Sequence, residues 1–152
     1  MYGKRNGKGV GAYKETNVIT ADPKRLVILC YEGAISSLKI ARAKYLTREY
    51  EAKGLAVQKA QDIISQLIEA LDFEKGGEIA KNLNALYKYM QRRIAEGDLK
   101  RDLNVFDEVI RLLEDLLSAW QEAFYGSPVK EATPVPKSVQ QGVQMTVAHS
   151  YA

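Results

Sequence analysis

Cysteine and histidine are almost absent from this sequence, with Cys30 and His149 as the sole examples among 152 residues. A single cysteine excludes an intrachain disulfide and is typical of a reducing compartment, so we expect a cytoplasmic location. Without a second histidine or cysteine, one chain cannot assemble a zinc site or a Cys–His nucleophilic pair. We therefore predict that the protein is not an enzyme and uses no metal or other cofactor.

Long apolar runs and phosphate-binding loops are also missing. No run approaches the roughly 20 residues of a membrane-spanning helix, and no signal-type apolar segment follows the basic N-terminus. The chain contains no GxxxxGK(S/T) loop, and we expect no small-molecule substrate. The net charge of +3 is mild and mixes both signs, which does not favour nucleic acid as the main partner.

Four stretches carry the apolar spacing of three and four residues that is typical of amphipathic helices. The first covers residues 23–46, because Asp22 can cap a helix whose first position is proline. The second follows a polar break at Thr47-Arg48 and ends near Asp72. Both are long enough to form one side of a helical bundle.

The third and fourth helices are separated from their neighbours by glycine and aspartate. Gly76-Gly77 supplies the turn before the third helix, since glycine adopts positive φ without a Cβ clash, and Gly97 is expected to end that helix. The fourth begins near Asp98 or Asp102 and continues to about residue 125. Short connections make successive helices antiparallel neighbours, so the sequence predicts an all-α, up-down four-helix bundle.

Composition divides the chain into three parts. Residues 1–21 begin with repeated glycines and are expected to form a flexible N-terminal arm. Residues 22–125 form the predicted bundle. Residues 126–152 contain three prolines among polar side chains, and we expect a disordered C-terminal tail.

The fourth helix has two apolar stripes. The first contains Leu103, Phe106, Ile110, Leu113, Leu117, Trp120 and Phe124, which is enough for a bundle seam. The second, rotated by roughly 110°, contains Val105, Val109, Leu112, Leu116, Ala119 and Ala123. A helix that touches two neighbours would need such a broad apolar face. Alternatively, part of the second stripe is a groove for an added amphipathic helix.

The run LVILCY, which begins at Leu26, leads to the same hypothesis, because it is apolar almost all round the first helix. Something beyond the neighbouring helices is therefore expected to cover it. The candidate residues of a partner-binding groove are Leu26, Val105, Val109, Leu112 and Leu116.

Three segments resemble one known family. They are AYKETNVITADPKRLVILCYEGAI, KAQDIISQLIEALDFEKGGEIAKNLNALYKYMQRRI and LLSAWQEAF, and they span about Val10 to Phe124. Their order, and above all the pattern DxEKGGEIAxNLxxLYxYMxRR, is similar to the flagellin-specific export chaperone FliS. The resemblance implies a cytoplasmic helical-bundle chaperone that binds the C-terminal segment of flagellin. Such a chaperone prevents premature polymerisation and helps deliver flagellin to the flagellar export gate.

The same resemblance implies a role for the N-terminal arm. The family's N-terminal tyrosine and the apolar residue three positions before it correspond to Tyr13 and Val10, which implies docking to the export gate. In the family this arm can also cover the flagellin groove of the free chaperone. The alternative function is that of a general helical adaptor or regulator, which would bind another amphipathic helix or nucleic acid.

Overall fold

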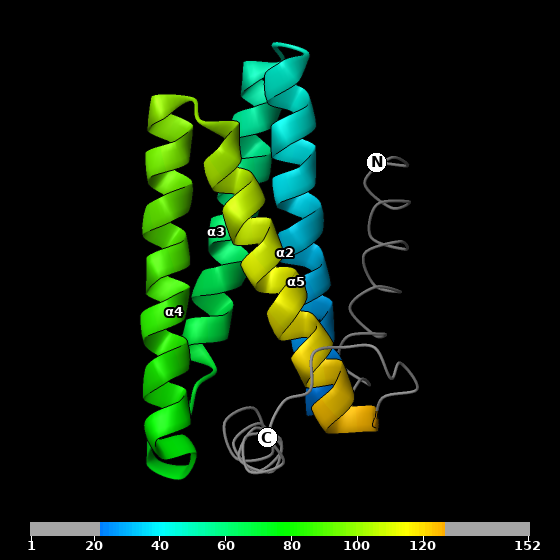
Figure 1. The fold of residues 1–152 in the computed structure, drawn as a ribbon, viewed down its shortest axis with the longest axis vertical. Helices are drawn as coiled ribbons and strands as arrows, with labels where there is room; N and C mark the ends of the chain where they lie inside the picture. The colour runs from blue at the N-terminus through cyan, green and yellow to red at the C-terminus, as the bar shows by residue number, and fades with distance from the viewer. Residues whose placement is uncertain (1–21, 127–152) are drawn as a thin grey trace, which may run out of the picture.

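The computed structural model describes residues 22–126, which form four helices in an antiparallel up-down arrangement (Figure 1). The helices are α2 (Pro23–Leu46), α3 (Tyr50–Glu69), α4 (Phe73–Lys100) and α5 (Leu103–Tyr125). Each helix packs against the next one in the chain, and α2 also packs against α5, which closes the bundle. The predicted all-α four-helix bundle is confirmed. The predicted arm and tail, with Val10 and Tyr13, lie outside the described residues.

Aspartates begin three of the helices as capping chemistry requires. The Asp22 side chain accepts a hydrogen bond from the Arg25 N–H at 2.7 Å, and Pro23 occupies the first helical position. Asp72 caps α4, and Asp102 caps α5. The choice left open between Asp98 and Asp102 is therefore settled in favour of Asp102.

Two of the predicted helix boundaries are wrong. The third helix begins at Phe73, before the glycine pair, although Gly77 has φ 54° and interrupts the helical geometry with a kink. Gly97 does not end α4, which continues to Lys100 and ends at Arg101 with φ 57°. A Cβ on Gly97 would lie 2.8 Å from the Cβ of Val105, so this glycine allows α4 to approach α5 closely.

The centre of the bundle holds an aromatic cluster. The hydroxyl groups of Tyr31 on α2 and Tyr87 on α4 are hydrogen-bonded at 2.5 Å, and both side chains are fully buried. The Trp120 ring of α5 lies 6.5 Å from that of Tyr31 between ring centroids. Side chains from α2, α4 and α5 thus meet around one buried hydrogen bond between two tyrosine hydroxyl groups, and aliphatic residues pack around them.

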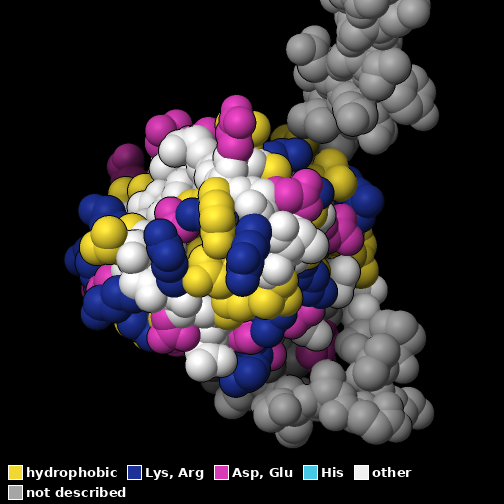
Figure 2. All heavy atoms as spheres, turned by 90° about the horizontal axis from the view of Figure 1, so that it is seen from above, with side chains coloured by type: hydrophobic (Ala, Val, Ile, Leu, Met, Phe, Trp, Pro, Cys, Tyr) yellow, Lys and Arg dark blue, Asp and Glu magenta, His cyan; other side chains and the backbone are white. Residues whose placement is uncertain are grey.

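The two turns at the upper end of the bundle connect α2 to α3 and α4 to α5 (Figure 1). Seen from this end, hydrophobic side chains occupy the middle of the surface between Lys and Arg side chains (Figure 2). Among residues 22–126, no helix is long and apolar enough to cross a membrane.

Candidate partner-binding surface

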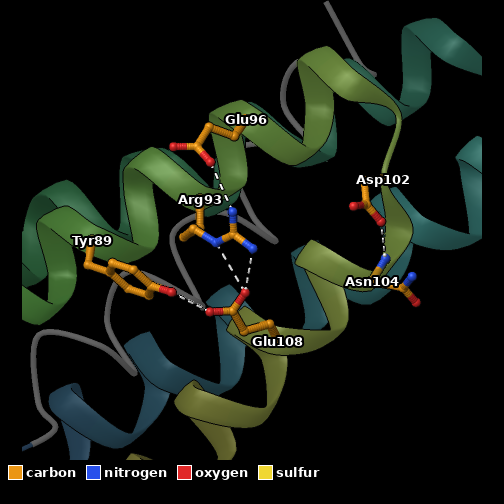
Figure 3. Close-up of polar contacts among 6 residues, drawn as sticks. All are labelled: Tyr89, Arg93, Glu96, Asp102, Asn104 and Glu108. Atoms are coloured by element: carbon orange, nitrogen blue, oxygen red, sulfur yellow. Dashed lines mark hydrogen bonds and ion pairs between the residues drawn. The ribbon is translucent and has the colours of Figure 1, made fainter.

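A polar contact joins α4 to α5 near their upper ends (Figure 3). The Tyr89 hydroxyl donates to Glu108 Oε2 at 2.5 Å, and the Arg93 guanidinium donates to Glu108 Oε1 at 2.8 Å and 3.1 Å. Arg93 also donates to Glu96 on its own helix at 2.9 Å. The hydrogen bond from Tyr89, and then those from Arg93, lower the pKa of the Glu108 carboxyl group, so this group is a carboxylate at neutral pH.

Below this contact α4 and α5 diverge (Figure 1), and both helices carry half-buried aliphatic residues. These residues are Leu112 and Leu116 on α5 and Ile79 and Leu86 on α4, and we call them the α4/α5 set. All four pack against the core while keeping part of their surface in water. The α4/α5 set therefore provides accessible apolar surface on both of the diverging helices.

The five predicted groove residues fall into two groups. Val105 and Val109 are buried, with 6% and 0% of their surface exposed, so they belong to the core and present no surface in this structure. Their burial follows from the close approach of α4 and α5 at Gly97. Leu112 and Leu116, one to two turns further along α5, are half-buried. The broad apolar face of α5 is thus partly a two-neighbour seam and partly accessible.

Leu26, the remaining groove residue, lies in the first turn of α2 and is half-buried. The next two residues, Val27 and Ile28, have only 1% of their surface exposed. The run LVILCY is therefore covered mainly by the bundle itself, and Cys30 is half-buried within it. Burial raises the pKa of the Cys30 thiol, which keeps it in the unreactive neutral form.

A second accessible apolar surface lies between α2 and α5, and the sequence reasoning missed it. It is an open groove of about 450 Å³ lined by Glu32, Ile35, Ser36, Lys39, Ile40, Ala43, Glu114 and Leu117. Ile40 has 49% of its surface exposed. The one signal in the sequence was an isoleucine that breaks the polar face of the first helix between Lys39 and Arg42.

Two charged pairs join α2 to α5, and one of them, Lys39–Glu114, lines the α2/α5 groove. Lys39 Nζ lies 3.3 Å from Glu114 Oε2, and Arg42 Nε lies 2.8 Å from Asp107 Oδ1. The Lys39–Glu114 pair is well exposed, so it stabilises the fold only slightly and can open at low cost, whereas the Arg42–Asp107 pair is partly buried. An incoming apolar segment could therefore displace the Lys39–Glu114 pair without unfolding the bundle.

Two accessible apolar surfaces, the α4/α5 set and the α2/α5 groove, lie on residues 22–126. No group of three or more metal-ligating side chains occurs among these described residues. The fold and its surface thus define a four-helix-bundle protein with two accessible apolar surfaces.

Comparison with known proteins gives the family. A family model described as "Flagellar protein FliS" matches residues 6–126, and this chain belongs to that family. The flagellar secretion chaperone FliS of Salmonella typhimurium is 40% identical over 119 residues, which cover 75% of this chain and 88% of the relative. The flagellar secretion chaperone FliSB of Pseudomonas aeruginosa is 41% identical over 106 residues, 70% of this chain and 84% of the relative.

A more distant relative completes the comparison. The flagellar secretion chaperone FliS of Bacillus subtilis is 30% identical over 112 residues, covering 74% of this chain and 83% of the relative. The family resemblance seen in the sequence motifs is confirmed.

Proposed function

We propose that this protein is a cytoplasmic export chaperone that binds the C-terminal segment of flagellin. In this role it prevents premature polymerisation of flagellin and helps deliver it to the flagellar export gate. Membership of the FliS family supports the proposal, as do relatives that are named flagellar secretion chaperones. A chaperone of this kind is not an enzyme, and membership of the FliS family supports that part of the proposal.

The observation that carries the proposal is the half-buried state of Leu112 and Leu116 beside the buried Val109. A leucine that is already anchored in the core loses little side-chain entropy when a partner covers its remaining surface. Covering apolar surface stabilises a complex by roughly 25 cal/mol per Å². The α4/α5 set therefore offers binding free energy without requiring the bundle to rearrange.

The α2/α5 groove extends the apolar surface to the other side of α5. Ile40 and Leu117 lie in this groove, whereas Leu112 and Leu116 belong to the α4/α5 set. One rigid helix could fill only one of these surfaces at a time. We infer that the flagellin segment is unfolded when free and crosses more than one helix of the chaperone as an extended chain with short helices.

The alternative function, a general helical adaptor or regulator, would use the same surfaces for a different helix. The two functions differ in their requirement for the C-terminal segment of flagellin. The chain should retain full-length flagellin in a pull-down and should not retain flagellin that lacks this segment. Equal retention of both forms would contradict the proposal and favour the adaptor function.

Surface variants locate the binding site in the same experiment. Leu112→Lys combined with Leu116→Lys should weaken binding at least tenfold, because lysine would place unpaired charge where flagellin covers the chaperone. The matched control is Leu55→Lys with Leu99→Lys, since Leu55 and Leu99 are 69% and 84% exposed and the added charge is the same. Normal binding by a folded Leu112→Lys/Leu116→Lys variant would remove these residues from the site.

A further inference from the structure

The upper end of the bundle is a surface that chaperone activity does not explain. The turn between α2 and α3 and the turn between α4 and α5 both lie here (Figure 1). An ion pair between Lys53, in the first turns of α3, and Asp98, in the last turn of α4, joins the two sides. The two turns therefore form one continuous surface.

Large apolar side chains are exposed on this end. Leu46, Tyr50 and Leu99 have 60%, 50% and 84% of their surface exposed. Viewed from the end, hydrophobic side chains lie in the middle, with Lys and Arg side chains beside them (Figure 2). A leucine that is this exposed contributes almost nothing to the core, so core packing does not explain why a leucine occupies the position.

Each turn also contains an arginine with positive φ. Arg48 has φ 61° and Arg101 has φ 57°, a conformation that glycine or asparagine adopts more easily. The backbone conformation of both turns favours glycine over arginine. The stability of the turns therefore does not explain the presence of arginine at these two positions. Both arginines are exposed.

Some of the charged groups at this end of the bundle form ion pairs or hydrogen bonds, and others form no ion pair. Glu49 pairs with Lys44, Asp98 pairs with Lys53, and Asp102 accepts a hydrogen bond from the Asn104 N–H at 3.0 Å. Within residues 22–126, Arg48, Lys100 and Arg101 form no ion pair, and the carboxylates of this end without one are Glu51 and Asp102. Three cations without an ion pair against two such carboxylates give the end a small net positive charge.

We propose that this end of the bundle docks on an anionic lipid surface. Leu46, Tyr50 and Leu99 would enter the headgroup region, where tyrosine and leucine gain from partial burial. Arg48, Lys100 and Arg101 would bind lipid phosphates, as cations beside an apolar patch do. None of these residues lines the α2/α5 groove, so the proposed lipid contact is separate from that groove.

The test is co-sedimentation of the full chain with phosphatidylcholine vesicles that contain or lack phosphatidylglycerol. We expect binding to the anionic vesicles that weakens with added salt. Arg48→Gly combined with Arg101→Gly should reduce the partition coefficient by about tenfold or more, since each cation near an anionic surface contributes about fivefold. Glycine accepts positive φ, so this variant keeps its helical signal and its thermal stability.

The matched control is Lys75→Ala combined with Lys88→Ala, which also removes two positive charges. Both lysines are exposed on α4 away from the upper end, and neither forms an ion pair among the described residues. The control should keep nearly all of the vesicle binding. Leu99→Ser should weaken binding several-fold although the net charge is unchanged.

Three outcomes would overturn the proposal. Failure of the full chain to bind anionic vesicles at low salt would show that this end does not bind lipid and would favour a protein partner for it. Equal loss in the arginine variant and the lysine control would indicate a general effect of net charge. Undiminished binding by the arginine variant would place the lipid contact elsewhere, for example at the cations Lys4, Arg5 and Lys8.

Discussion

Tyr89 on α4 donates a hydrogen bond to the carboxylate of Glu108 on α5, with 2.5 Å between the oxygen atoms. The other oxygen of the same carboxylate accepts from Arg93, one turn further along α4. One side chain of α5 is thus bound to two turns of α4. This contact joins α4 and α5 near their upper ends (Figure 3), and the two helices diverge below it (Figure 1).

Glu108→Gln should destabilise the bundle at neutral pH, because the neutral amide would lack the charge that strengthens both contacts. For a domain of about 100 residues we expect the melting temperature to fall by roughly 3–8 °C. Circular dichroism during heating measures this change. Glu114→Gln is the control, since the Lys39–Glu114 pair is exposed and contributes little.

The difference between the wild type and Glu108→Gln should depend on pH. Tyr89 and Arg93 lower the pKa of Glu108 in the folded state, so the unfolded state binds a proton more readily. The stabilising effect of Glu108 is therefore complete above the unfolded pKa and is lost as the pH falls through the lower, folded pKa. Urea unfolding from pH 7 to pH 3 should show the two proteins converging below about pH 4. A constant difference would contradict the pKa shift.

Two glycine substitutions should have opposite effects on stability. Gly97→Ala should destabilise by about 1–3 kcal/mol, because the new Cβ would lie 2.8 Å from the Cβ of Val105. Gly54→Ala should stabilise by roughly 0.5–1 kcal/mol, since Gly54 lies inside α3 with no atom within 4 Å of a new Cβ. Denaturant unfolding measures both. Similar effects of the two changes would show that the contact between Gly97 and Val105 leaves room for an added methyl group.

The buried hydroxyl pair should behave as a coupled unit. Tyr31→Phe and Tyr87→Phe should each destabilise by about 1–2 kcal/mol, because each removes one partner of the 2.5 Å hydrogen bond in the core. The double variant should lose less than the sum of the single losses. Strict additivity in this double-mutant cycle would mean that the hydrogen bond contributes nothing to stability.

Local signals in the sequence were sufficient for much of the fold. Asp22-Pro23 and the polar break at Thr47 determine the bounds of α2, because capping and proline geometry act within one turn. Gly97 misled the prediction because glycine is used there for a helix contact rather than a helix end. Such a contact depends on Val105, which belongs to the next helix, and local periodicity does not reveal it.

The binding surface was harder to predict than the helices. Periodicity places Val109 and Leu116 on one stripe, yet Val109 is buried and Leu116 is half-buried. The difference arises because α4 approaches α5 at Gly97 and diverges further down, and that angle is a property of the packed bundle. The proposed lipid-binding end was also missed, since its residues come from two turns that lie far apart in the sequence.

The N-terminal residues should separate cargo binding from delivery. Tyr13 lies outside the described residues, and the family resemblance implies that it docks to the export gate. Tyr13→Ala should therefore leave the helical signal and flagellin binding unchanged while reducing association with the gate in a pull-down. Loss of flagellin binding with normal gate association would contradict this division of roles.

The proposal that flagellin becomes ordered across several helices is tested most directly by calorimetry combined with amide exchange. Binding of the isolated C-terminal segment of flagellin to the full chain should show a strongly negative heat-capacity change and a large opposing entropy. Amide protection should increase on α5 and on at least one of α2 and α4. A heat capacity that barely changes, with protection confined to one helix, would contradict the proposal and indicate a single local contact.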